Sequence, residues 1–164
     1  MSTERSRYTE RTPWPGFALA VFWGAILLAC YPILAGWDHD LPTAARWPIV
    51  GGVVGFAALV QGLLGGLTVR VEDTRLVVHL GSVPLVRRFI PYVEILEVES
   101  VVYRPIREFG GWGVRGRGER KAWTARGDRA VKLTLTGGRE LLVGSDRPHR
   151  LEERIRAVAS IVRA

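Results

Sequence analysis

The chain has few of the residues that build disulfide-rich, metal-binding or thiol-dependent proteins. Its 164 residues include one cysteine, Cys30, so a disulfide within the chain is excluded. The three histidines lie far apart, and no HExxH, CxxC or GxSxG motif occurs. These absences predict no catalytic residues, no metal site and no cofactor. The sequence therefore favours a non-enzymatic protein.

Charge is missing from two long segments, residues 17–37 and 47–69. At about 1.5 Å per residue, each segment would form a helix slightly longer than 30 Å, which matches the hydrocarbon core of a bilayer. The buried helix of a soluble protein rarely stays uncharged for this long, and the apolar region of a signal peptide is shorter, about 7 to 15 residues. Both segments are therefore predicted to be transmembrane helices.

Basic residues are distributed unequally around these two helices. Residues 1–16 carry three arginines, residues 38–46 carry one, and residues 70–164 carry most of the remaining positive charge. The positive-inside rule then places both ends in the cytoplasm. We predict a multi-pass inner-membrane protein with a cytoplasmic tail (1–16), a hairpin (17–69) whose outer loop is 38–46, and a cytoplasmic domain (70–164).

The predicted cytoplasmic domain alternates apolar and polar residues in short runs and then changes period. The alternation predicts strands with a tight turn at 72–74 and a second hairpin turn at Gly137–Gly138. The expected strands are residues 69–71, 76–80, 85–90, 93–103, 121–126, 130–136 and 139–143. After Pro148, apolar residues recur at helical spacing, which predicts a C-terminal amphipathic helix that covers the sheet.

Four segments of this domain, in this order, resemble bacterial pleckstrin-homology-like (PH-like) membrane proteins. They are GWGVR at 111–115, AVKLTL at 130–135, GGRELLVGS at 137–145 and DRPHRL at 146–151. The resemblance covers residues 67–162. It implies an α+β fold of about seven antiparallel strands, in a bent sheet or partly open barrel, closed by one C-terminal amphipathic helix after a transmembrane hairpin.

The same resemblance bears on the ligand. Eukaryotic pleckstrin-homology domains bind phosphoinositides through basic residues in the first hairpin loop. The corresponding loop here is Glu72-Asp73-Thr74, which is short and acidic. Specific phosphoinositide binding at that loop is therefore not expected.

Residues 104–126 carry most of the domain's net positive charge, with seven basic and two acidic side chains. Aromatic residues and five glycines are interspersed among them. A basic segment with aromatic side chains favours contact with anionic lipid headgroups. The residues predicted to contact lipid or another anion are Arg107, Arg115, Arg117, Arg120, Lys121 and Trp112.

Two other ligands fit parts of this basic segment. The RGRG string at 115–118 is similar to Arg-Gly segments that bind single-stranded nucleic acids. The membrane anchor already accounts for the positive charge, so we prefer lipid to nucleic acid. Residues 111–116 also match GxGxxG, but a nucleotide-binding loop needs a helix after it, and a strand is predicted there.

The second apolar segment contains two GxxxG pairs, formed by Gly51, Gly55, Gly62 and Gly66. Small residues let helix backbones approach closely in lipid, so these glycines are predicted to pack against a helix, either within the hairpin or in another copy of the chain. The sequence as a whole predicts a membrane-anchored binding or scaffold module that contacts anionic headgroups, a partner protein or both. The alternative is an accessory or assembly subunit of a larger membrane complex that docks through the glycine-faced hairpin.

Overall fold

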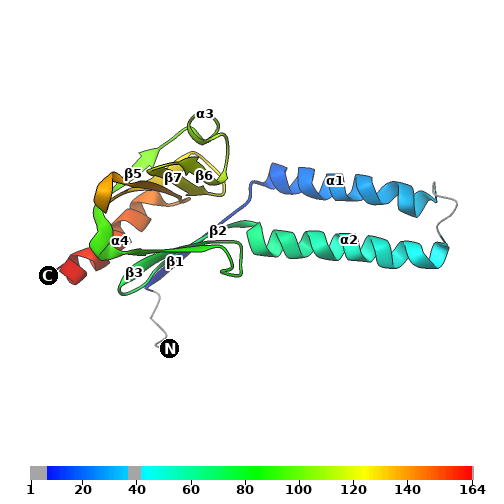
Figure 1. The fold of residues 1–164 in the computed structure, drawn as a ribbon, viewed down its shortest axis with the longest axis horizontal. Helices are drawn as coiled ribbons and strands as arrows, with labels where there is room; N and C mark the ends of the chain where they lie inside the picture. Colours follow the sequence, from blue (N-terminus) through cyan, green and yellow to red (C-terminus); the bar gives the residue numbers. More distant parts are fainter. Residues whose placement is uncertain (1–6, 37–41, 164) are drawn as a thin grey trace.

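The computed structural model describes residues 7–36 and 42–163. A helical hairpin and a domain of two β-sheets lie one after the other along the long axis of the molecule (Figure 1). Residues 38–41 of the predicted outer loop lie outside the described residues, whereas residues 43–46 are helical instead of forming part of a loop.

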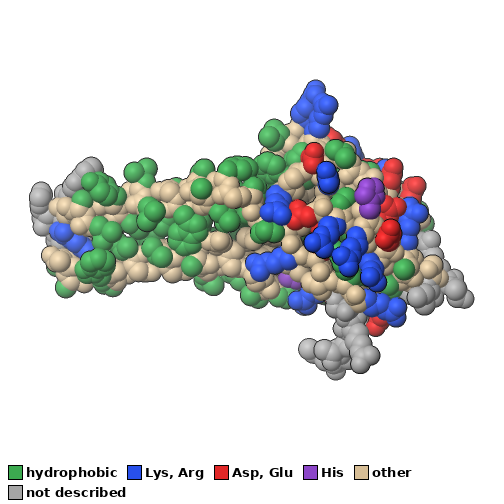
Figure 2. Space-filling model, turned by 180° about the vertical axis from the view of Figure 1, so that it is seen from behind, with side chains coloured by type: hydrophobic (Ala, Val, Ile, Leu, Met, Phe, Trp, Pro, Cys, Tyr) green, Lys and Arg blue, Asp and Glu red, His purple; other side chains and the backbone are tan. Residues whose placement is uncertain are grey.

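The hairpin consists of α1 (Gly16–Ala35) and α2 (Thr43–Leu64), which are long and apolar enough to cross a membrane. Only 6% of the residues in the most apolar stretch of each helix are buried, whereas a helix in a soluble core would be mostly buried. Apolar side chains cover the outside of the hairpin (Figure 2). The two predicted apolar helices are thus confirmed, although α2 ends at Leu64, five residues before the predicted boundary.

Sheet A contains four antiparallel strands in the order β1-β2-β3-β4. They are β1 (Tyr8–Pro13), β2 (Gly66–Val71), β3 (Arg75–Leu80) and β4 (Arg87–Pro91). The hairpin at residues 72–74 follows the sequence-based expectation, and the strand expected at 85–90 is present as β4 but begins two residues later. Strand β1 does not, because residues 1–16 were expected to be a tail. The sheet domain therefore begins before the first helix and resumes after the second.

Sheet B has five strands in the order β5-β8-β9-β7-β6. They are β5 (Ile95–Val102), β6 (Gly113–Arg117), β7 (Arg120–Thr124), β8 (Arg129–Leu135) and β9 (Glu140–Gly144). A short helix, α3 (Pro105–Phe109), precedes β6. The predicted β8–β9 hairpin is confirmed, whereas β6 and α3 lie in the glycine-rich part of the basic segment, for which neither was predicted.

The expected single sheet of about seven antiparallel strands is therefore replaced by nine strands in two sheets within the described residues, and they do not form a closed barrel. The break follows Pro91, where the chain turns through the 3-10 helix Tyr92–Glu94. Pro91 is opposite Arg75 and is the last residue of β4, and it has no backbone N–H to donate to a further strand. Strand β7 also pairs with β9 in parallel, which departs from the antiparallel expectation.

The core lies between the two sheets and is completed by α4 (Pro148–Arg163), which packs against β5 and β8. Both sheets and α4 contribute fully buried apolar side chains. These include Leu67, Val69, Val78, Leu133, Leu141, Leu151 and Ile155. The amphipathic helix thus covers the sheet as its spacing predicted.

The beginning of α4 is held by a carboxylate from β1. Glu10 accepts hydrogen bonds from the Ser145 hydroxyl (2.8 Å) and from the backbone N–H groups of Asp146 (2.9 Å) and Arg147 (3.2 Å). These two amides directly precede α4, and negative charge is favoured at the N-terminus of a helix. This contact links β1, near the N-terminus of the sequence, to the start of α4, near its C-terminus.

A second carboxylate, Glu152 on α4, binds β5. It accepts hydrogen bonds from the backbone N–H (3.0 Å) and the hydroxyl of Ser100, and it pairs with Arg156 at 2.7 Å. Arg156 in turn donates to the carbonyl oxygen of Val98. These bonds occupy groups on the edge strand β5, so α4 covers that edge as well as the core.

We expect the Glu152 contact to make stability depend on pH. The Ser100 hydroxyl is the main cause of a lowered pKa of the Glu152 carboxyl group. The Glu152 contact stabilises the fold fully above the pKa of this carboxyl group in the unfolded chain, about 4.5. This stabilisation is lost as the pH falls through the lower pKa of the group in the folded chain. Glu152→Gln should therefore melt below the wild type near neutral pH and converge with it in acid.

Thermal unfolding of the full chain in mild detergent, followed by tryptophan fluorescence over a pH series, measures this difference. Glu153→Gln is the matched control, because Glu153 is the neighbouring, exposed residue on α4. A difference between Glu152→Gln and the wild type that stayed constant across the pH series would contradict the assignment.

Candidate functional site

Trp112 lies where the sheet domain meets the helices. Its ring centroid is 6.0 Å from that of Phe17, in the first turn of α1. Its Nε1–H donates to the carbonyl oxygen of Gly127 at 2.8 Å. These two contacts hold the indole at the level where α1 begins.

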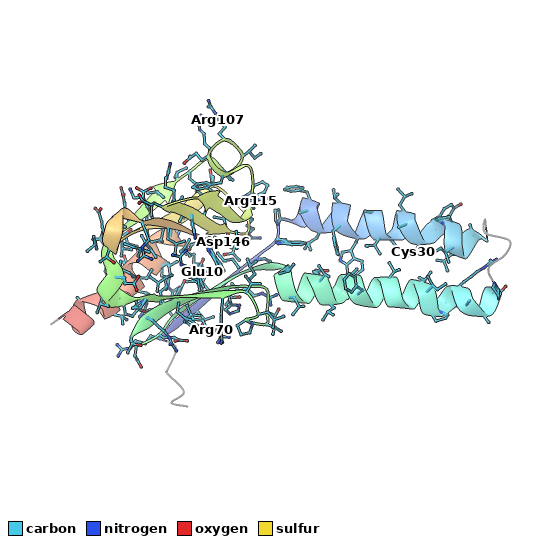
Figure 3. The ribbon with its side chains drawn as sticks, in the orientation of Figure 1. Glu10, Cys30, Arg70, Arg107, Arg115 and Asp146 are labelled. Carbon is cyan, nitrogen blue, oxygen red and sulfur yellow. The ribbon has the colours of Figure 1, made fainter. Side chains whose placement is uncertain are left out.

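The β6–β7 hairpin extends away from this point. Gly113 pairs with Thr124 at the end beside Trp112, and Arg117 pairs with Arg120 at the opposite end. Arg115 lies between the two ends and donates through Nε to the carbonyl oxygen of Trp112 at 3.2 Å (Figure 3). The structure therefore places Arg115 and Trp112 together near the helices.

The other predicted anion contacts are not part of this group. Arg120 pairs with Glu140 at 2.9 Å and with Glu108 at 3.7 Å, so acidic neighbours already balance its charge. Arg107 projects from α3 at the outer surface of the domain (Figure 3). Lys121 is exposed near the far end of the β6–β7 hairpin, and the side chain of Arg117 is outside the described part of the structure.

A second apolar segment approaches the helices from sheet A. The loop at residues 81–86 follows β3, and the backbone N–H of Ser82 donates to the carbonyl oxygen of Gly62 near the end of α2 (3.0 Å). Val83, Leu85 and Val86 are 48%, 66% and 43% exposed. The loop thus holds three exposed apolar side chains at the level where α2 ends.

Gly81 makes this close approach feasible. Its φ is +66°, and a Cβ atom at this position would lie 2.1 Å from the carbonyl oxygen of Leu63. Glycine has neither the steric nor the conformational penalty. Residues 85–90 were expected to form a strand, but β4 begins at Arg87, and residues 85 and 86 belong to this loop. The run Val83-Pro84-Leu85-Val86, apolar and interrupted by proline, was the available signal.

Trp112, Val83, Leu85 and Val86 together form what we call the helix-end rim. Basic side chains gather on the domain next to the helices, whereas the described surface of the hairpin carries no charged side chain until its far end, where α2 contains Arg46 (Figure 2). The rim therefore combines apolar side chains with nearby positive charge, and the two components come from different sheets.

The predicted packing glycines are located away from α1. Within the described residues, a Cβ at Gly51, Gly55 or Gly62 would meet no atom within 4 Å, and Gly66 belongs to β2. The contact with α1 instead involves Ala57, which is 3% exposed, and Gln61, whose Oε1 accepts a hydrogen bond from Trp23 Nε1 at 2.7 Å. A packing role for the glycine face against another chain stays a prediction.

No protein-family model, curated protein or solved structure matches this chain. Across residues 7–36 and 42–163, no three His, Cys, Asp or Glu side chains are close enough to hold a metal ion.

Ala57 faces α1 and Gly55 does not, so replacing each of them with leucine is predicted to have opposite effects on the stability of the hairpin. Ala57→Leu would overpack the α1–α2 contact, at a cost of about 1–3 kcal/mol. Gly55→Leu would add a side chain to an open face and remove a helix glycine, which favours the helix by about 1 kcal/mol. Thermal unfolding in detergent should show a lower melting temperature for Ala57→Leu alone. Equal destabilisation by both variants would contradict this arrangement of the hairpin.

Proposed function

We propose that this protein is a membrane-anchored, non-enzymatic binding or scaffold module whose sheet domain contacts anionic lipid headgroups. The observation that carries the proposal is the helix-end rim. Trp112 and the apolar loop 81–86 lie at the level where α1 begins and α2 ends, and they flank the hairpin on two sides. If the helices span a bilayer, these side chains meet the headgroup layer.

Two kinds of side chain favour contact between this rim and the lipid headgroups. Tryptophan prefers the headgroup level, and each well-placed arginine near an anionic leaflet contributes about 1 kcal/mol. Because the hairpin already holds the domain at the surface, the effective concentration is high and weak contacts are sufficient. Arg115 donates a hydrogen bond to the carbonyl oxygen of Trp112. Among the residues predicted to contact headgroups, it is therefore the best located for this role.

The proposed topology places the domain on the cytoplasmic face of the inner membrane. Strands β1 and β2 flank the hairpin in sequence and pair with each other, so both ends of the hairpin are on the same side. With the distribution of positive charge, this supports an N-in, C-in arrangement. A PH-like classification is part of the proposal, supported by the strands and the terminal α4, while the two-sheet division departs from the expected pattern.

A probe at Val114 tests the headgroup contact. Val114 is exposed and adjacent to Arg115, and Cys30→Ala removes the only other thiol. We expect a polarity-sensitive fluorophore on Val114→Cys to emit at shorter wavelength in nanodiscs of phosphatidylcholine with phosphatidylglycerol than in phosphatidylcholine alone. Adding Arg115→Gln should reduce the difference, because it removes the charge that attracts the anionic leaflet.

Thr136→Cys provides the matched control, because Thr136 is exposed on the turn after β8, at the end of the domain remote from the helices. Its emission should not depend on the lipid. The same spectrum for the Val114 probe in both kinds of nanodisc would refute headgroup contact by this segment.

A second function is favoured by the glycine face of α2. Gly51 and Gly55 are exposed and are not covered by α1, so a helix of another protein has room to pack there. We propose as the alternative an accessory or assembly subunit of a larger membrane complex.

The two functions separate in one experiment. If the protein is a subunit, affinity purification in mild detergent with mass spectrometry should recover a protein partner from the wild type. Gly55→Leu should lose that partner while the Val114 probe keeps its response to anionic lipid. Recovery of the same partner with Gly55→Leu would exclude docking through this face.

A further inference from the structure

Four residues form a single row across sheet A near the helices. The strand registers pair Arg11 with Thr68, Thr68 with His79, and His79 with Arg87. Neighbouring residues such as Leu67 and Val78 point into the core, and successive side chains of a strand point to opposite faces. The row is therefore on the outer face of the sheet, away from α4.

His79 is the buried member of this row, with 1% of its surface exposed. Its Nδ1 lies 3.3 Å from the carbonyl oxygen of Leu80, and its Nε2 has no hydrogen-bonding partner among the described residues. A buried polar atom without a partner costs free energy, so such an atom requires an explanation. Nε2 itself has almost no exposed surface, so a ligand group would supply the missing hydrogen bond once the side chains over the ring move aside.

The surroundings of His79 carry only positive charge. Arg11, Arg87 and, in the next row, Arg70 are on the same outer face and form no ion pair with an acidic side chain in the described part of the chain (Figure 3 labels Arg70). The acidic residues of the distant β2–β3 turn are already paired, Glu72 with Arg75 and Asp73 with Arg7. Glu10 faces the opposite side, toward Ser145. This outer face therefore favours an anion.

The depth of the row suggests the source of the anion. The row is two strand positions beyond the Pro13–Gly66 pair, where the chain leaves the sheet for α1 and α2. At about 3.3 Å per residue this is about 7 Å, comparable with the 5–8 Å of headgroup layer outside each side of the hydrocarbon core. The estimate rests on the proposed function, because it requires that the hairpin spans the membrane.

We propose that this row, together with Arg70, binds the phosphate group of an anionic lipid headgroup, with Arg11, Arg70 and Arg87 supplying the charge and His79 a buried hydrogen bond through Nε2. This site lies on sheet A beside the end of α2. It is separate from the Trp112–Arg115 contact, which lies on sheet B beside the start of α1. The two sites would hold the domain against the leaflet on both sides of the hairpin.

The site should be sensitive to pH. Because Nδ1–H donates to the Leu80 carbonyl, Nε2 donates to a phosphate only when the ring is protonated. Burial is the main cause of the lowered pKa of His79, and Arg70 and Arg11 lower it further. The neighbouring strands contribute the cations Arg11, Arg70 and Arg87, and the loop 81–86 contributes no titratable group. The negative charge of a bound phosphate offsets the repulsion between the arginines and a protonated His79. Binding of phosphate therefore favours protonation of His79, and protonation favours binding of phosphate.

The full chain in mild neutral detergent tests the site without a bilayer. Calorimetric titration with short-chain phosphatidylglycerol, whose phosphodiester keeps a single charge over this range, should show binding that is stronger near pH 6 than near pH 8, within the range where histidine titrates. Arg87→Gln and Arg70→Gln should each weaken binding by about tenfold, the effect of losing one charge-assisted hydrogen bond. Arg154→Gln, an exposed arginine on α4, should bind like the wild type.

His79→Gln should keep part of the affinity and lose the pH dependence, because a glutamine amide donates at any pH. The unfolding temperature of each variant distinguishes loss of the site from loss of the fold. This check matters for Arg87→Gln, because the exposed Arg87 guanidinium lies over the Phe89 ring, 5.0 Å from its centroid.

Three results would overturn the proposal. Equal binding of inorganic phosphate would refute a lipid ligand, and equal binding of short-chain phosphatidylcholine would refute recognition of an anion. Affinity unchanged by Arg87→Gln and Arg70→Gln would refute the location. Failure of the headgroup contact at Val114 would leave this titration unaffected, since the titration uses no bilayer, so the two proposals fail separately.

Discussion

Strand β1 pairs with β2 over six residues, from Tyr8 opposite Val71 to Pro13 opposite Gly66, and the two helices continue from the Pro13–Gly66 end of this pair. The pairing holds both ends of the hairpin at one edge of sheet A. Adjacent strands are about 4.8 Å apart, whereas packed helices are 8–10 Å apart. The short connections at residues 14–15 and at Gly65 allow the chain to spread between these two spacings.

This constraint orients the sheet domain relative to the hairpin. Because the strands of sheet A continue the direction of the helices (Figure 1), position along a strand becomes distance from the hairpin. The loop 81–86 and the end of α2 are then neighbours, and Gly62 accepts its hydrogen bond from Ser82. Glu10 extends the constraint to α4 by accepting hydrogen bonds from the amides of Asp146 and Arg147, the two residues that directly precede the helix. One strand of the N-terminal segment thus connects the hairpin, sheet A and α4.

The same arrangement gives the domain two different surfaces near the helices. On the side of α1, sheet B presents Trp112 and Arg115. On the side of α2, sheet A presents an apolar loop and, one step further out, a row of cations around a buried histidine. In a bilayer, apolar side chains are favoured next to the hydrocarbon core and cations are favoured at the phosphates. Sheet A has the same order, with the apolar loop nearer the helices and the cations further from them.

The sequence alone determined the elements whose signal is local. Two uncharged segments specify the helices, alternation with a tight turn specifies β2–β3 and β8–β9, and the period of Leu151 and Ile155 specifies α4. Strand β1 has no such pattern, since Tyr8–Pro13 alternates few apolar residues and pairs with residues beyond the whole hairpin. The glycine-rich β6 was not predicted either, because it also lacks an alternation of apolar and polar residues. Arg11, Thr68, His79 and Arg87 come from four strands, and only strand register makes them neighbours. Tertiary structure decided the sites because hydrogen bonding between distant segments, not local preference, sets that register.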